Sequence, residues 1–253
     1  MIDINAPEFW PDLIDVLWLG LLQTLYMVGG SLFWTILIGL PLGVLLVTTE
    51  KGGLLASPFG SRAFGAVVNR IIDFVVNLGR SVPFIILMIA LIPFTRLLLG
   101  RFIGTDAAIV PLSAVAIPFF ARMVEIALKE VDSGLVEAGE SLGASKWQII
   151  RKVLLPEAMP SIILGTSTTI TSIINFSAMA GVVAAGGLGD VAIRYGYQRY
   201  SWPHIIAVII VLFALVMLLQ GLAALIARAL AHRGPVRRIT LGRLTDPRAA
   251  VPD

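Results

Sequence analysis

The chain has few residues with which to carry out covalent or metal chemistry. It has no cysteine and only two histidines, His204 and His232, which lie far apart in the sequence. Without cysteine there is no disulfide, no thiolate metal ligand and no thiol nucleophile. Neither histidine belongs to an HExxH pattern. We therefore expect no metal site and no catalytic residue in this chain.

Charged residues are also scarce. They make up 14% of the 253 residues, whereas 57% are hydrophobic. Soluble domains carry about 25% charged residues. Too few polar side chains remain to cover this chain in water, which predicts an integral membrane protein. The net charge of +3 does not indicate nucleic acid as a partner, because the basic residues flank the apolar runs, as membrane topology requires.

Five apolar runs are long enough to cross a bilayer, which takes roughly 20 residues each. They lie within Leu13–Thr49, Val67–Leu99, Ala107–Leu128, Pro160–Ala185 and Trp202–Ala231. We expect an all-α membrane protein with five transmembrane helices. Pro83 and Pro93 are expected to kink or end the second span, and Pro111 and Pro118 to break the third.

Basic residues predict the orientation of the spans. No Lys or Arg precedes Lys51, and most of the 19 basic residues fall in segments that are cytoplasmic if the N-terminus lies outside. The positive-inside rule therefore favours N-out and C-in. The predicted organisation is an external N-terminus at residues 1–12, a membrane domain at 13–231 and a basic cytoplasmic tail at 232–253, where contact with anionic lipid is expected.

A polar segment, EAGESLGASKWQIIRKVLLP at residues 137–156, separates the third and fourth spans. Gly143, Trp147, Ile150 and Leu154 are spaced for one apolar helical stripe, and Ser133 is a candidate N-cap, with Asp132 beside it. These features predict one or two short helices across the cytoplasmic mouth. From the residues alone, such a segment either rests on lipid headgroups or docks a soluble partner.

The same segment resembles the signature of the permeases of ABC importers. That signature is E-A-A, three residues, G, nine residues and I-x-L-P. Here it reads Glu137–Gly139, then Gly143, then Val153–Pro156, with the spacing intact. Two positions depart from it, because Gly139 replaces the second Ala and Val153 replaces Ile.

The resemblance implies that residues 137–156 form a coupling helix, which docks in a cleft on a cytoplasmic ATPase and moves with it. The residues expected to carry this coupling are Glu137, Ala138, Gly139, Gly143, Leu155 and Pro156. None of the four lysines follows a glycine, so the chain has no Walker A motif with which to bind ATP. We therefore expect no cofactor in this chain, and ATP-Mg on a separate subunit.

Longer stretches resemble the methionine-uptake permeases in particular. They include Arg80–Gly100, Pro118–Leu128, Arg151–Pro160 and Ser177–Tyr200, and the resemblance extends from about Leu13 to Ala231. It implies a multi-pass protein of the bacterial inner membrane that imports L-methionine, and often D-methionine. The implied partners are a second copy of this permease, two ATPase subunits and an extracytoplasmic methionine-binding protein. Another amino acid or a small organic ion stays open as the cargo.

The fourth span carries the candidate translocation pathway. Small or polar residues recur there at helical spacing, namely Ser161, Gly165, Thr168, Ser172, Asn175 and Met179. Such a face either lines a path on a dimer axis or packs on a neighbouring helix. We single out Asn175, Ser177 and Met179 as pathway or gate residues, since a thioether suits a methionine cargo.

Further expectations concern single residues. Asp73 is expected to pair with Arg70 or Asn77 on its own helix, and Arg80 to anchor the cytoplasmic end of its span or to face the axis. Tyr195, Tyr197 and Tyr200 are expected in an outer aromatic belt, and 186–189 in an outer turn or re-entrant segment. No acid is expected deep in a span, which disfavours an ion-coupled secondary transporter.

Overall fold

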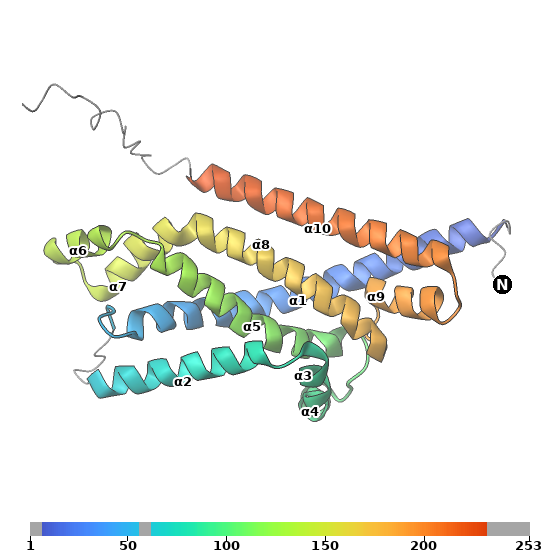
Figure 1. Ribbon diagram of the computed structural model, residues 1–253, viewed down its shortest axis with the longest axis horizontal. Helices are drawn as coiled ribbons and strands as arrows, with labels where there is room; N and C mark the ends of the chain where they lie inside the picture. The colour runs from blue at the N-terminus through green and yellow to red at the C-terminus, as the bar shows by residue number, and fades with distance from the viewer. Residues whose placement is uncertain (1–6, 56–61, 232–253) are drawn as a thin grey trace, which may run out of the picture.

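The computed structural model describes residues 7–55 and 62–231, and every regular element in these ranges is helical. The helices form an elongated bundle (Figure 1). The short helices α6 (Ser133–Ser141) and α7 (Lys146–Ile149) lie at one end, and α9 (Gly187–Val191) lies toward the other. These are termed the α6 end and the α9 end below. The predicted basic tail, 232–253, lies outside the described residues.

Helix α1 (Phe9–Thr49) packs along α5 (Thr105–Lys129). The buried positions of α1 recur three or four residues apart and are mostly small or β-branched; they include Gly20, Thr24, Val28, Ser31, Thr35, Gly39 and Gly43. A Cβ atom added at Gly43 would lie 2.6 Å from the carbonyl oxygen of Ala121. Membrane helices associate through such close backbone approach, so this face holds α1 against α5.

The second span is built from two helices that meet at a sharp bend. Helix α2 (Arg62–Ser81) ends just before Pro83, and α3 (Phe84–Ala90) continues at 108° to it. Helix α4 (Ile92–Leu99) follows, with Pro93 in its first turn. Proline lacks an N–H and disfavours the helical conformation of the preceding residue. The expected breaks at both prolines are confirmed.

Helix α5 is continuous, so the prediction that Pro111 and Pro118 break it is wrong. The ring of Pro118 lies against α2 at Gly79, where an added Cβ atom would be 2.7 Å from the proline Cγ. The missing side chain at Gly79 makes room for the ring. Neighbouring helices commonly let a membrane helix accommodate proline in this way.

The last two spans run side by side. A π-helical turn, Ile150–Leu154, leads into α8 (Leu155–Ala180), and a short 3₁₀ turn, Gly181–Val183, follows it. Helix α10 (Trp202–Ala231) packs along α8 but is mostly exposed. In its most apolar stretch, only 11% is buried inside the bundle. An apolar helix this exposed is suited to contact lipid.

Helix α9 and the π-helical turn Ala192–Tyr197 connect α8 to α10. Two hydrogen bonds hold α9 on α1: the Gly187 N–H donates to Gln23 Oε1 at 2.8 Å, and the Leu188 N–H donates to Thr24 Oγ1 at 2.9 Å. The side chains of α1 thus satisfy the first backbone donors of α9, which have no partner within that helix. The predicted outer turn is therefore a short docked helix.

Four helical stretches in the described part of the chain are long and apolar enough to cross a membrane, and the bent α2–α3 pair makes a fifth when counted as one span. The four are Phe9–Thr49, Thr105–Lys129, Lys146–Val183 and Trp202–Leu230. The prediction of an all-α membrane protein with five spans is confirmed, with the second span folded from a bent pair.

Candidate functional site

The segment between α5 and α8 forms two short helices, as predicted. Asp132 caps α6 by accepting a hydrogen bond from the Gly134 N–H at 2.8 Å, so the expected cap at Ser133 is wrong by one residue. Ser145 caps α7, and its side chain and that of Gln148 bond each other's backbone N–H in a capping box. Each helix therefore has a defined start despite its short length.

The predicted apolar stripe of Gly143, Trp147, Ile150 and Leu154 is wrong. Gly143 lies in the turn between the helices at φ +77°, and Trp147 is 66% exposed. The buried residues are instead Ile149, Ile150 and Leu154. The π-helical turn holds one residue more than an α-helical turn, so Ile149 and Ile150 both face the bundle.

The residues predicted to couple lie on different sides of this segment. Glu137 and Ala138 are exposed on α6, whereas Gly139 is half-buried. A Cβ atom added at Gly139 would lie 3.3 Å from Ile149, so the small residue lets α6 approach α7. Leu155 and Pro156 are the first residues of α8, where proline loses no helical hydrogen bond.

Two apolar side chains of this segment are strongly exposed. Leu142 is 87% exposed in the turn after α6, and Trp147 projects from α7. Sequence reasoning missed Leu142, although an apolar residue within a polar stretch is a usable signal. These exposed apolar side chains make the segment a candidate contact surface.

Five charged residues form a cluster between α1, α2 and α5 near the α6 end; this charge cluster comprises Glu50, Asp73, Arg122, Glu125 and Lys129. Glu125 is buried and bonds Arg122 at 2.5 Å and Lys129 at 3.0 Å. Lys129 also pairs with Glu50 at 2.8 Å. The cluster thus links the end of α1 and the last turns of α5 to the middle of α2.

The cluster corrects one expectation. Asp73 pairs with Arg122 of α5 at 3.5 Å, and the structure gives it no ion pair with Arg70 of its own helix. The acid Glu125 is buried near the end of the third span rather than deep within it. It lies one turn from the end of α5 and is bonded to two cations, as a buried carboxylate requires.

The candidate pathway face of α8 is divided along its length. Toward the α6 end it packs, because Ser161 donates to Glu130 at 3.0 Å and Gly165 faces Met123. Toward the α9 end Asn175 and Met179 are exposed. Ser177 lies on the opposite, buried side and donates to the Ile174 carbonyl at 2.8 Å. The structure therefore does not bring Ser177 together with the other two.

The tyrosines near α10 also divide. Tyr197 and Tyr200 are exposed, in line with an aromatic belt, but Tyr195 stacks on buried His204 with ring centroids 5.3 Å apart. His204 Nδ1 lies 2.7 Å from the Ser201 hydroxyl. His204 is thus part of a packed cluster. Within 7–55 and 62–231, no three His, Asp or Glu side chains lie close enough to hold a metal ion.

The chain matches known proteins over most of its length. Residues 52–232 match the family model described as binding-protein-dependent transport system inner membrane component. A probable D-methionine transport system permease protein of Vibrio cholerae is 50% identical over 219 residues, which cover 87% of this chain and 94% of that protein. A relative of the same description from Pasteurella multocida is 47% identical over 90% of this chain and all of that protein.

A solved structure agrees with these relatives. A chain of the MetNI methionine ABC transporter, in inward-facing conformations, is 43% identical with a TM-score of 0.81. The alignment covers 90% of this chain and 99% of that one. The family model spans more than half of the chain and includes the α6–α7 segment. This chain is therefore a member of the binding-protein-dependent transport system inner membrane component family, the membrane-embedded permeases of ABC transporters.

Proposed function

We propose that this chain is the permease subunit of an ATP-driven importer whose cargo is methionine, the L-form and also the D-form. The single observation that carries this proposal is the similarity, near 50% identity over nearly the whole chain, to permeases described as D-methionine transporters. The chain itself catalyses no reaction. Its orientation is N-out and C-in, so the α6 end is cytoplasmic.

The α6–α7 segment is the surface on which the ATPase docks. Glu137 and Ala138 are exposed on α6, and Leu142 and Trp147 present apolar side chains beside them. A charged and apolar surface of this kind suits a protein cleft, with apolar anchors surrounded by polar contacts. Gly139 and Gly143 set the angle between the two short helices, and Pro156 begins the span that moves with them.

Two copies of this chain and two ATPase subunits make up the assembly, and an extracytoplasmic methionine-binding protein delivers the cargo. ATP-Mg is bound by the ATPase, since this chain has no Walker A motif. A two-fold axis brings the same face of each copy together. The exposed Asn175 and Met179 of α8 supply such a face, and Met179 serves as the apolar gate. Ser177 supports this face from its buried side.

Uptake by reconstituted vesicles tests the cargo. Vesicles that contain this chain and its ATPase are expected to accumulate labelled methionine only when ATP is enclosed with the ATPase inside the vesicle and the binding protein is supplied outside. Omitting the binding protein or ATP is the control. Accumulation of another amino acid or of a small organic ion, with no methionine uptake, would contradict the assignment.

Co-purification tests the docking surface. Leu142→Ala and Glu137→Lys are expected to lower the amount of ATPase recovered with this chain, because each removes an exposed contact from α6 or its turn. Tyr200→Ala is the matched control, since Tyr200 is as exposed as Leu142, at 87%, but lies near the α9 end. Equal ATPase recovery with all three variants would place the docking surface elsewhere.

A further inference from the structure

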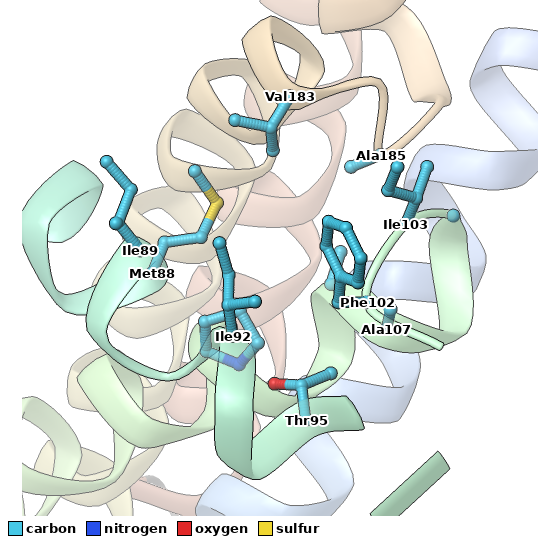
Figure 2. A pocket seen from close by; sticks show the side chains of 12 residues that line it. Met88, Ile89, Ile92, Thr95, Phe102, Ile103, Ala107, Val183 and Ala185 are labelled. Carbon is cyan, nitrogen blue, oxygen red and sulfur yellow. The ribbon is translucent and has the colours of Figure 1, made fainter. Parts of the chain in front are cut away.

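An apolar cavity of about 250 Å³ lies at the α9 end, between α3, α4, α5 and the turn after α8 (Figure 2). Its floor is buried and includes Met88, Thr95 and Ala107. Its rim is exposed and includes Phe102 and Val183. Among its 12 lining residues none is charged, and Thr95 carries the one polar side chain.

The cavity lies where the helices of the bundle are interrupted. The break at Leu91 between α3 and α4 borders it on one side, and the turn containing Val183 borders it on the other. Val183 follows Met179, the candidate gate, by one helical turn toward the α9 end. Interrupted helices at membrane depth occur where the backbone borders a cavity or a binding site.

A second, more polar cavity of about 350 Å³ shares the lining residues Gly104 and Ala185 with the first. It contains an ion pair in which Arg194 Nη2 lies 2.9 Å from Asp190 Oδ2. The Asp190 side chain is mostly buried, and that of Arg194 is half exposed. The apolar cavity and the carboxylate–guanidinium pair therefore belong to neighbouring cavities whose linings share Gly104 and Ala185.

We propose that the apolar cavity receives the side chain of the cargo on its way to the gate, and that Asp190 and Arg194 are the charge partners of its α-amino and α-carboxylate groups. This inference rests on the proposed methionine cargo and names its site in the permease. The ligand class is a zwitterionic amino acid with an unbranched, apolar side chain.

Size and chemistry both support a methionine side chain. Cavities of about 150 Å³ accept benzene, and sites for drug-sized ligands begin near 300 Å³. A flexible chain of four heavy atoms suits the space between these values. Phe102 and Met88 offer the aromatic and thioether contacts that favour sulfur. A hydrocarbon tail carries no charged group that could pair with Asp190 or Arg194. The neighbouring ion pair therefore favours a zwitterion over a lipid chain as the ligand.

Protection of an introduced thiol tests the site directly. The natural chain has no cysteine, so Thr95→Cys supplies a single thiol on the cavity floor. The complex of this variant with its ATPase, in lipid nanodiscs, is treated with a small methanethiosulfonate reagent, and modification of this chain is followed by mass spectrometry. Methionine is expected to slow labelling in a saturable manner, about tenfold at nine times its dissociation constant.

Ser113→Cys is the matched control. Ser113 of α5 is also a buried hydroxyl residue, but it borders neither of the two cavities at the α9 end and lines a third one. Its labelling is expected to be unchanged by methionine. Glutamine, which is zwitterionic and of similar length but has a polar end, is expected to protect neither thiol. Labelling of Thr95→Cys that methionine does not slow, or that lipid removal alone accelerates, would overturn the proposal.

The width of the cavity gives a second measurement. Ile92→Ala enlarges the cavity. The ratio of uptake of the S-ethyl homologue of methionine to uptake of methionine is therefore expected to rise about tenfold, which is the lower end of the discrimination that one methylene gives in an apolar pocket. Ile109→Ala, in the cavity that Ser113 borders, is expected to leave this ratio unchanged. If the unaltered complex does not import methionine, the proposed function fails. If it imports methionine but Ile92→Ala gives the same uptake ratio as Ile109→Ala, only the cavity assignment fails.

Discussion

Replacing Glu125 by Gln is expected to loosen the α6 end of the bundle. The change keeps the size of the side chain but removes the charge that pairs with both Arg122 and Lys129. Two cations are then left beside a neutral amide. Breaking a fully buried pair costs about 3–5 kcal/mol, and the cost here is lower because the side chains of Arg122 and Lys129 are 29% and 44% exposed.

A cost of about 2 kcal/mol follows, since a hydrogen bond to a charged group contributes about 1.5–3 kcal/mol. In a chain of this size, 1 kcal/mol shifts the Tm by roughly 2–4 °C, so Glu125→Gln is expected to lower the Tm by roughly 4–8 °C. The measurement is thermal unfolding of the purified permease–ATPase complex in one detergent at fixed protein concentration.

Glu50→Gln is the matched control, because it removes a carboxylate from the same Lys129. The Glu50 side chain is 51% exposed, and an exposed ion pair contributes about 0–1 kcal/mol. A Tm shift of at most a few degrees is therefore expected. Lys129→Gln combined with Glu125→Gln should cost less than the sum of the single changes, because the residues are in direct contact. Equal Tm shifts for Glu125→Gln and Glu50→Gln would refute the role assigned to burial.

Three further changes and one control test the packing of the spans and the docking of α9. Gly43→Ala should lower the Tm, at a cost of about 1–3 kcal/mol for overpacking, whereas Gly29→Ala should leave it unchanged, because an added Cβ meets nothing within 4 Å there. Thr24→Val should speed hydrogen exchange at the Leu188 amide, which loses its acceptor; an unchanged exchange rate would contradict the docking of α9. Gly79→Ala should also lower the Tm, because the added methyl group meets the Pro118 ring; a Tm equal to that of the unaltered complex would contradict the tight α2–α5 contact.

The spans were predictable because each is an apolar run whose signal lies within one segment. The break at Pro83 was predictable for the same reason, since proline acts on its own backbone. Pro118 differs, because its accommodation depends on Gly79 of another helix. Whether a proline breaks a membrane helix therefore depends on its neighbours, which one segment does not show.

The coupling segment was located by its spacing, but its buried face was not. A period of 3.6 residues assigns Trp147 and Ile150 to one side, and one π-helical turn changes which residues face the bundle. Contacts between residues far apart in the sequence could not be predicted either. The hydrogen bonds from α9 to Gln23 and Thr24 span 164 residues, and Asp73 finds Arg122 on another helix.

The length of α1 bears on the membrane in which this protein works. Its 41 residues make a rod of about 60 Å, at about 1.5 Å per residue, whereas the hydrocarbon layer is about 30 Å thick. Even at a tilt of about 40° the rod exceeds that thickness. Part of α1 therefore stands beyond the hydrocarbon, and exposed Trp10 and Trp18 near its start are suited to the headgroup region. Because α1 packs along α5, matching a thicker or thinner bilayer requires the packed helices to tilt together.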